Sequence, residues 1–326
     1  MKIYFAPLEG ITGFIFRNAY NDIFESKIDK YFSPFIAPGI NQVLSRKEMR
    51  DILPENNCGI NLVPQLLGCR STEMLMAIEQ IKDLGYKEIN INLGCPSGTV
   101  VAKKKGSGFL AYPDELDAFL YEIFEKSDID ISVKTRIGKD APEEFYKILD
   151  IYNKYQMSEL IIHPRIQKDF YKNHPNMEMF EYATKNSKNT LCYNGDIVFL
   201  QDFAGIVSKY GEFNMNSVMI GRGLLRNYML VDEIVEGKKV DRNKIIDFHQ
   251  RIMSDYIKEM SGERPVLFKM KELWTYMGDL FLDCDKELKK LRKATKLAEY
   301  EIYAKNILKN YEINATKWHS FYTYCM

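Results

Sequence analysis

The stretch Glu88-Ile-Asn-Ile-Asn-Leu-Gly-Cys-Pro96 is a short β-rich apolar run that ends in a tight turn. It is the fourth of eight such runs, and each is followed by a segment with the apolar spacing of an amphipathic helix. From the fourth run onward their starts recur about every 30 to 40 residues, which is the size of a parallel βα unit. The runs cover residues 2–7, 30–36, 60–66, 88–93, 129–135, 159–163, 190–194 and 217–220.

Eight βα units within roughly 235 residues predict an α/β fold closed into a (β/α)₈ TIM barrel. An open, doubly wound sheet is the alternative. Its dinucleotide-binding form would place the pattern G-x-G-x-x-G after the first strand, whereas the sequence there reads Pro7-Leu-Glu-Gly-Ile-Thr-Gly13. The missing pattern favours the barrel.

After Gly237 the pattern changes to helices alone, which we expect at residues 241–260, 265–277 and 286–308. We therefore predict a barrel domain in residues 1–237 and an all-helical domain in residues 238–326. The whole chain has 45 basic and 45 acidic residues, but residues 238–309 have 17 basic and 12 acidic ones, a net charge of +5. The second domain is the better candidate for a polyanionic partner.

The chain has 326 residues, of which 46% are hydrophobic, enough to bury a substantial core. It begins without a long apolar region and contains no run of roughly 18 apolar residues, so we expect a cytoplasmic protein outside the membrane. The six cysteines are scattered without a Cys-x-x-C pair, which predicts reduced thiols and no metal site. They are Cys58, Cys69, Cys95, Cys192, Cys284 and Cys325.

Polar side chains occur at the ends of several of the predicted strands. In a TIM barrel these ends converge on one face, where ligands bind. Such side chains fill a core poorly but hold a polar ligand well, so we predict a binding site on this face. The residues are Gln65, Asn92, Lys134, Arg136, His163, Arg165, Asn194, Asp196 and Arg222.

The seventh and eighth strands end in Asn194-Gly-Asp196 and Ile220-Gly-Arg-Gly223. Their glycines allow backbone N–H groups to approach a phosphate, and the Arg222 guanidinium adds a charged fork. Each motif alone could simply make a tight turn. Because barrels commonly bind phosphate after these two strands, the pair favours a phosphate site.

Lys134 and His163 each allow more than one interpretation. Lys134 could be a Schiff-base nucleophile, the counter-charge to an anionic cofactor, or a salt-bridged structural residue. A lysine near N1 of a flavin would stabilise its reduced, anionic form. His163 could be a satisfied core residue, but its place before Pro164 and Arg165 at a strand end favours a hydrogen bond to a ligand.

Cys95 lies between a glycine and a proline just past the fourth strand. Most cysteines are small buried hydrophobes, yet a rigid turn suits a reactive group better than a packing group. An ordinary thiol is mostly protonated at neutral pH, and no His or Asp nearby in sequence marks it as an activated nucleophile. We therefore expect Cys95 to act as a general acid.

These motifs together resemble the tRNA-dihydrouridine synthases, in order and in spacing, over the whole predicted barrel. The most specific are the Asn-x-Gly-Cys-Pro loop, the Lys-x-Arg strand end and the His-x-Arg strand end. The matching stretches are Ala6-Pro-Leu-Glu-Gly-Ile-Thr12, Gln65-Leu-Leu-Gly68, Asn92-Leu-Gly-Cys-Pro96, Val133-Lys-Thr-Arg136, His163-Pro-Arg165, Asn194-Gly-Asp-Ile197 and Ile220-Gly-Arg-Gly223.

The resemblance implies an FMN cofactor, NADPH as electron donor and tRNA as substrate, with no obligate protein partner. It also implies hydride transfer from FMN N5 to C6 of a uracil, with Cys95 protonating C5, on a nucleotide that has left its stack. The implied FMN residues are Pro7, Leu8, Glu9, Gln65, Lys134, His163, Asn194, Gly195, Asp196, Gly221 and Arg222. The implied substrate residues are Asn92, Arg136 and Arg165, with Arg264, Lys269 and Lys271 of the helical domain as candidates for phosphate contacts. The loop with Lys103, Lys104 and Lys105 is unusually basic for the family and could close over the RNA.

Two positions depart from the family pattern. Leu8 stands where methionine is frequent, and Pro164 replaces a small residue between His163 and Arg165. Rival interpretations are a flavin barrel that reduces a free small molecule, a tRNA-binding protein with a vestigial site, and a Schiff-base aldolase. The basic helical domain speaks against the first, and the intact Cys95, Lys134 and Arg222 speak against the second.

Overall fold

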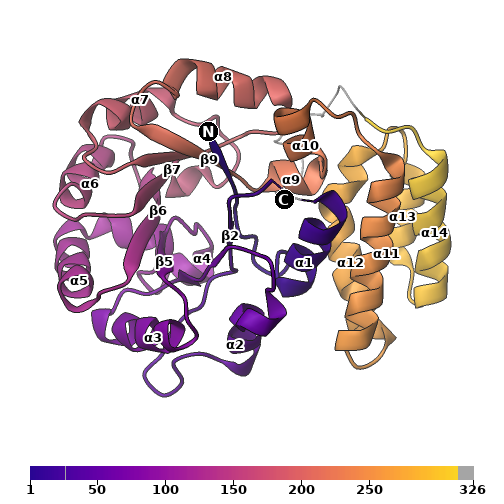
Figure 1. Ribbon diagram of the computed structural model, residues 1–326, viewed down its shortest axis with the longest axis horizontal. Coiled ribbons are helices and arrows are strands. Elements are labelled where there is room, and N and C mark those ends of the chain that lie inside the picture. The colour runs from indigo at the N-terminus through magenta and orange to yellow at the C-terminus, as the bar shows by residue number, and fades with distance from the viewer. Residues whose placement is uncertain (26, 315–326) are drawn as a thin grey trace.

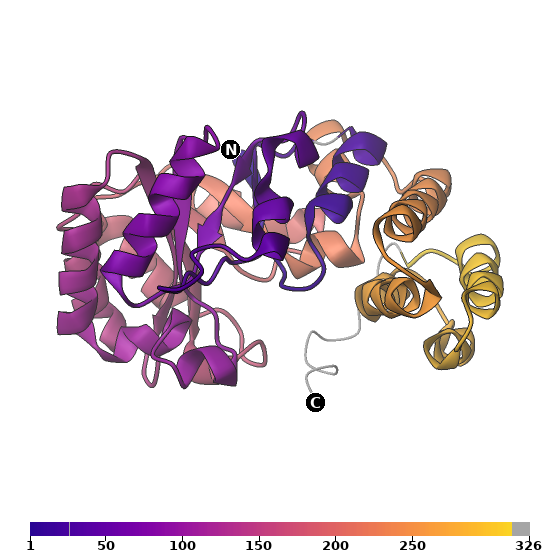
Figure 2. The same ribbon diagram turned by 90° about the horizontal axis from the view of Figure 1, so that it is seen from below.

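The computed structural model describes residues 1–25 and 27–314, so Cys325 and the last twelve residues of the predicted helical domain lie outside the described residues. Figure 1 shows a ring of helices around a parallel sheet, with a second group of helices packed on one side. The same arrangement seen from below in Figure 2 separates the two groups clearly. Among the described residues, no helix is both long and apolar enough to span a membrane.

The predicted barrel is confirmed, because all the strand pairs are parallel and the sheet order runs β3-β2-β1-β9-β8-β7-β6-β5-β4. The two ends of this order are consecutive in the chain and separated by Pro64 alone, which brings the sheet round into a ring. The strands are β1 (Lys2–Phe5), β2 (Lys30–Phe32), β3 (Leu62–Val63), β4 (Gln65–Leu66), β5 (Glu88–Leu93), β6 (Asp130–Gly138), β7 (Glu159–Ile166), β8 (Leu191–Asn194) and β9 (Met215–Ile220).

The third predicted strand, residues 60–66, is wrong as a single strand. Pro64 has no N–H to donate to a ladder, so the run divides into β3, which pairs with β2, and β4, which pairs with β5. The Pro64 carbonyl still accepts the Asn90 N–H at 2.9 Å. The second predicted strand is also shorter than expected, since β2 ends at Phe32 and Ile36 forms an isolated bridge with Leu66.

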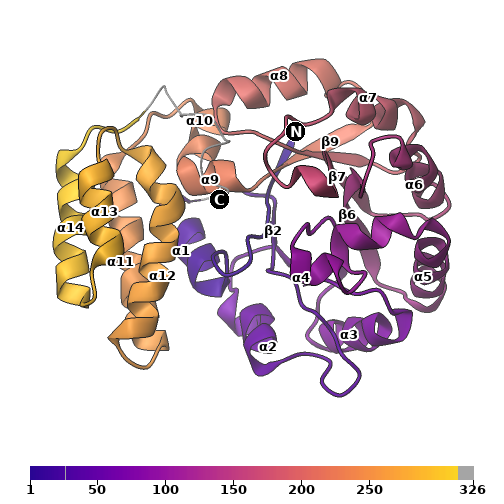
Figure 3. The same ribbon diagram turned by 180° about the vertical axis from the view of Figure 1, so that it is seen from behind.

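The barrel helices alternate with the strands and bury their apolar faces against the sheet. They are α1 (Phe14–Phe24), α2 (Arg46–Ile52), α3 (Ser71–Asp83), α4 (Gly98–Val101), α5 (Pro113–Lys126), α6 (Glu144–Tyr152), α7 (Met177–Asn186), α8 (Leu200–Tyr210), α9 (Arg222–Arg226) and α10 (Leu230–Glu236). Figure 3 looks onto the face that carries α4, which follows the carboxyl end of β5. That face holds the predicted site.

The carboxyl-terminal helices are α11 (Arg242–Glu259), α12 (Glu263–Met277), α13 (Asp285–Lys293) and α14 (Leu297–Asn310). The prediction of one helix over residues 286–308 is wrong. The Ala294 carbonyl accepts the Lys271 ammonium instead of a helical N–H, and Ala294 has an extended ψ of 136°. The Thr295 N–H then bonds the Glu299 carboxylate at 3.1 Å as α14 begins.

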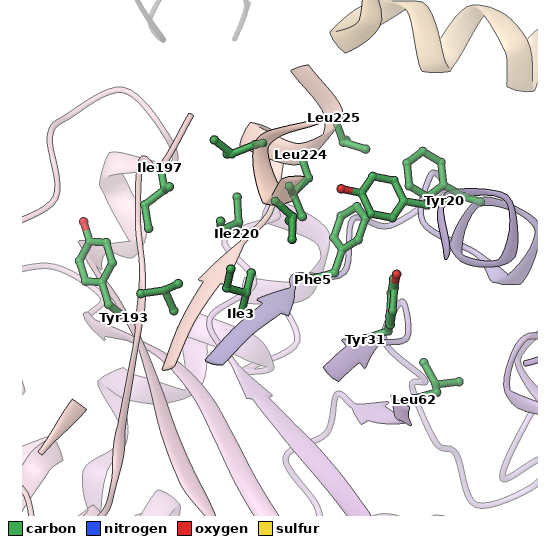
Figure 4. Packing of buried hydrophobic residues seen from close by; sticks show 14 of the residues in the cluster. Ile3, Phe5, Tyr20, Tyr31, Leu62, Tyr193, Ile197, Ile220, Leu224 and Leu225 are labelled. Atoms are coloured by element: carbon green, nitrogen blue, oxygen red, sulfur yellow. The ribbon is translucent and has the colours of Figure 1, made fainter. Parts of the chain in front are cut away.

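An aromatic cluster joins the two groups of helices. Phe248 of α11 lies with its ring centroid 5.3 Å from those of Phe16 and Phe24 on α1, and 4.7 Å from that of Tyr228. Figure 4 shows the adjoining part of the core, where Phe5 and Tyr20 point toward each other from β1 and α1. This contact fixes the carboxyl-terminal helices against the barrel. The domain boundary after Gly237 stays a prediction, although Gly237 does end α10 in a left-handed conformation with φ 65°.

Candidate active site

A pocket opens at the carboxyl ends of the strands. Nine of the eleven predicted cofactor residues line it: Pro7, Leu8, Lys134, His163, Asn194, Gly195, Asp196, Gly221 and Arg222. Ala6, Tyr171, Ile197 and Gly223 complete the lining. The loops after strands β1, β6, β7, β8 and β9 therefore meet as the barrel rule requires.

Glycines shape the end of the pocket formed by β8 and β9. A Cβ on Gly223 would lie 1.9 Å from the Ile197 carbonyl oxygen, and one on Gly195 would lie 2.0 Å from the Tyr193 hydroxyl. Neither position has room for a side chain, which agrees with the interpretation that these glycines make tight turns. The same absence of side chains leaves the backbone at the start of α9 open to a ligand, since Gly221 and Gly223 line the pocket as well.

Lys134 projects from β6 into this pocket. Burial lowers the pKa of its ammonium to about 8, and the neighbouring Arg136 contributes to that shift. Within residues 1–25 and 27–314, the ammonium has no hydrogen bond or ion pair. The side chain lines the pocket and is only partly shielded from solvent, so its ammonium can meet a negatively charged ligand there.

His163, Arg165, Asp196 and Arg222 form a connected network behind the pocket. The Asp196 carboxylate accepts from Arg165 and also from Arg222 at 3.1 Å. Arg165 is fully buried and donates from Nη1 to His163 Nε2 at 2.8 Å. Because a guanidinium only donates, His163 Nε2 accepts and the neutral ring carries its proton on Nδ1. Burial lowers the pKa of His163 well below its ordinary value, so the ring stays neutral.

The loop that carries Cys95 is held from below by Asn92. The Asn92 amide oxygen accepts the N–H groups of Gly94 at 3.0 Å and Cys95 at 2.9 Å. The Asn92 amide nitrogen donates to Gln65 at 2.7 Å, and Gln65 donates to Asn90 at 2.8 Å. Gln65 and Asn92 are buried, so this chain of amides fixes the turn rather than lining the pocket.

The Cys95 backbone is also fixed from behind. Its carbonyl accepts the Ser107 N–H at 3.1 Å and the Ser107 hydroxyl at 2.8 Å. Gly106 approaches so closely that a Cβ would lie 2.7 Å from the same carbonyl oxygen. Burial raises the pKa of the Cys95 thiol, although Arg136 and Lys134 oppose that shift. The thiol is therefore protonated at neutral pH and close enough to Lys134 to interact with its charge.

Arg136 joins two loops of the mouth. Its guanidinium donates to the Gly94 carbonyl at 3.0 Å on one side, and to the carbonyls of Ile166 at 2.8 Å and Phe170 at 2.6 Å on the other. The side chain is fully buried. This geometry makes Arg136 a clamp between the Cys95 loop and the loop after β7.

Sequence reasoning did not identify Tyr171. Its ring lies 4.2 Å from the Arg222 guanidinium and 5.4 Å from that of Arg136, so it stacks over the cations at the pocket edge. Tyr171 belongs to a loop without a recognisable motif, so no sequence signal singles it out. Ala6, Ile197 and Gly223 do lie within the quoted motifs, and their positions beside predicted residues could have identified them.

Glu9 lies apart from the pocket, in a larger groove of about 1380 Å³ between the barrel and the carboxyl-terminal helices. Lys269 lines the same groove and donates to the Gly10 carbonyl and to Glu272. Lys271 is bound to the Ala294 carbonyl. Two of the three predicted basic contacts of the helical domain are thus engaged within the chain, whereas Arg264 is exposed.

The three lysines of the loop after Cys95 also differ in whether they are paired within the chain. Lys104 pairs with Glu115 at 3.4 Å and lies 4.1 Å from the Tyr112 ring centroid. Lys103 is exposed and Lys105 half-buried, and the described part of the chain gives neither an ion pair. Among the residues that the structure describes, no group of three or more His, Cys, Asp or Glu side chains could hold a metal ion.

Fold and site together define a (β/α)₈-barrel protein with a cationic pocket and a protonated thiol at its mouth. The family model described as dihydrouridine synthase (Dus) matches residues 4–312. The chain therefore belongs to the dihydrouridine synthase family.

Individual relatives agree at modest identity. The chain is 28% identical over 269 residues to a probable tRNA-dihydrouridine synthase of Staphylococcus aureus (strain COL), with 78% of each chain covered. It is 25% identical over 263 residues to tRNA-dihydrouridine synthase B of Pasteurella multocida (strain Pm70), covering 79% of this chain and 77% of that one. The solved histamine dehydrogenase from Rhizobium sp. 4-9 superposes with a TM-score of 0.53 at 10% identity, over 83% of this chain and 49% of that one, which supports the barrel fold alone.

Proposed function

We propose that this protein is a tRNA-dihydrouridine synthase that binds FMN in the barrel pocket and uses NADPH to reduce uridines in tRNA. The observation that carries the proposal is that Asn92 pairs with Lys134 across β5 and β6, which sets the Cys95 turn, held by Asn92, beside the strand whose Lys134 lines the pocket. That pairing supports reduction of a carbon–carbon double bond, because such a reaction needs a proton donor beside a site that holds a negatively charged reductant.

The pocket residues fit a phosphate-bearing, anionic cofactor. Two cations, Lys134 and Arg222, line the pocket, and the Asp196 carboxylate that lines it with them accepts from Arg222 and from Arg165. FMN would place its phosphate at the glycines after β8 and β9, near Arg222, with Lys134 and His163 beside its ring. When bound and reduced by NADPH, FMN supplies the hydride that C6 of a uracil accepts.

In this proposal Cys95 gives its proton to C5 of the uracil, and the thiolate that remains takes a proton from solvent. The raised pKa keeps the proton on sulfur until the carbon accepts it. Asn92 and Ser107 hold the turn, so the Sγ atom stays in one place. We infer that Asn92, Arg136 and Arg165 act as positioning residues, because their hydrogen bonds are made to the protein.

The tRNA partner is supported by the names of the relatives and by the basic residues around the mouth. Lys103 and Lys105 on one side and Arg264 on the other would contact phosphates, while the target uridine leaves its stack to reach the pocket. A barrel that reduces a free small molecule would need neither set of cations. The experiment below separates these possibilities.

The test uses the full-length protein loaded with FMN, NADPH and an unmodified tRNA transcript. The proposal predicts an absorbance band near about 450 nm and a tRNA mass gain of about 2 Da for each reduced uridine. Protein that stays colourless after FMN is added would contradict the cofactor assignment. Free uridine reacting as fast as tRNA would contradict the substrate assignment instead.

A further inference from the structure

Phe268 of α12 is the most exposed aromatic side chain among the described residues, with 67% of its surface accessible. The residues of α12 that pack into the helical core are Val266, Leu267, Met270, Leu273, Trp274 and Met277. Phe268 lies on the opposite face, so its ring contributes little to this core. A single exposed apolar residue is common on protein surfaces, so exposure alone does not indicate a ligand, and the inference depends on the charges around this ring.

The surroundings of Phe268 are mainly basic, because Glu272, the acidic residue one turn after it, is paired with Lys269. Arg264 lies one turn before it and Lys271 one turn after it on the same face of the helix. Lys271 contacts the Ala294 carbonyl, which brings the end of α13 beside this face. Lys293 and Lys296 flank Ala294, and both are exposed without an ion pair in the described part of the chain.

The same helix reaches the edge of the active-site face. Lys269, next to Phe268, donates to the Gly10 carbonyl in the loop after β1. Pro7 and Leu8 of that loop line the pocket. The helix that carries Phe268 is therefore anchored to the loop after β1, whose first residues line the pocket.

We propose that Phe268 is a stacking platform for an unpaired nucleobase of the tRNA. An aromatic ring flanked by cations suits single-stranded RNA, because the ring stacks on a base while the cations bind the phosphates on either side of it. A protein partner would meet excess positive charge here and would need an acidic surface to match. This inference rests on the proposed function, because the molecule that would stack on Phe268 is the tRNA substrate.

The test measures the affinity of the full-length protein for an unmodified tRNA transcript over a range of salt concentrations. Stacking contributes about tenfold to affinity per base, so Phe268→Ala should weaken binding about tenfold without changing the salt dependence. Arg264→Met should instead reduce the salt slope by about one counterion. Phe268→Trp should restore binding, and its fluorescence should be quenched when tRNA binds.

Ile302→Ala is the matched control, because Ile302 on α14 is equally exposed at 67% and should leave affinity unchanged. Unchanged affinity in Phe268→Ala would overturn the proposal. A shift from dimer to monomer in Phe268→Ala without RNA would overturn it too, since a second copy of the chain would then cover the ring. Wild-type protein that reduces tRNA uridines while Phe268→Ala binds tRNA normally would refute this inference alone. Failure of the wild-type reaction would refute the proposed function.

Discussion

The two ends of the barrel differ in whether their charged side chains have partners within the protein. At the amino ends of the strands, Lys30 at the start of β2 pairs with Glu88 at the start of β5 at 2.5 Å. Glu159 at the start of β7 accepts from Ser217 at 2.5 Å and from Tyr4 at 3.3 Å. At the carboxyl ends, Lys134 has no such partner in the described part of the chain. One end neutralises its charge within the protein, and the other keeps positive charge for a ligand.

This contrast separates stability from function in physical terms. A buried ion pair that loses one member leaves an uncompensated charge, which destabilises the fold. A partly buried cation without an ion pair contributes little to the stability of the free protein, and a bound anion adds stability by binding the folded state. Substitutions at the two ends should therefore have opposite effects on the unliganded protein.

The largest expected effect lies at the mouth and concerns the reaction alone. Cys95→Ala removes the proton donor, so uridine reduction should fall by roughly 10²- to 10⁴-fold. FMN binding and NADPH oxidation should be retained, because the Asn92 and Ser107 contacts are made to the backbone of this turn. Single-turnover reduction of tRNA, followed by mass spectrometry, measures this loss. A Cys95→Ala protein that loses FMN would show that the residue is structural.

At the amino end, Lys30→Met should lower the free energy of unfolding by about 2 to 3 kcal/mol, since Glu88 loses its partner beside Glu159. Burial raises the pKa of Glu159, which shows how little solvent compensates for charge there. Urea denaturation measures the change. The FMN dissociation constant should match that of wild type. A Lys30→Met protein as stable as wild type would remove the contrast between the two ends.

Lys134→Met should weaken FMN binding about tenfold, because it removes one charge-assisted contact worth about 1 to 2 kcal/mol. Fluorescence titration of FMN measures the dissociation constant. Lys139→Met is the control, since Lys139 follows the same strand and is half-buried like Lys134 but lies outside the pocket. Equal dissociation constants for Lys134→Met and wild type would contradict the role of Lys134 as counter-charge.

The smallest effect is a pH dependence of FMN binding. The pKa of Lys134 is lowered to about 8, so the unliganded lysine is charged below that pH and neutral above it. An anion favours the charged form, so affinity should fall as pH rises through 8. Titrations from pH 7.5 to 9.5, above the second ionisation of a phosphate monoester at about pH 6, should show this fall in wild type and not in Lys134→Met. A wild-type profile that is flat as well would exclude Lys134 from the binding equilibrium.

Much of the carboxyl end was predictable, because hydrophobic periodicity locates strand ends and the barrel rule brings those ends together. Lys134, His163 and Arg222 meet for that reason. Contacts that depend on the folded geometry of the loops could not be predicted from the sequence. The capture of Arg136 by the Ile166 and Phe170 carbonyls depends on loop geometry.

The other wrong predictions have the same cause, because they too depend on contacts between residues far apart in the sequence. The break between α13 and α14 contains no Gly or Pro, and it depends on the Lys271 ammonium reaching the Ala294 carbonyl from another helix. The contrast between the two ends of the barrel depends on which charges pair across strands, and composition alone does not give those pairs. Pro64 is the exception, since a proline inside a strand run signals a broken ladder.

Thermal unfolding of three proteins, with and without FMN, tests the central claim most directly. Without FMN, the melting temperature should be highest for Lys134→Met, lower for wild type and lowest for Lys30→Met, because Lys134 has a partly buried charge with no ion pair among the described residues, whereas Lys30 is paired with Glu88. With saturating FMN, wild type should melt above Lys134→Met. A Lys134→Met protein that melts below wild type without FMN, by as much as Lys30→Met does, would contradict the account.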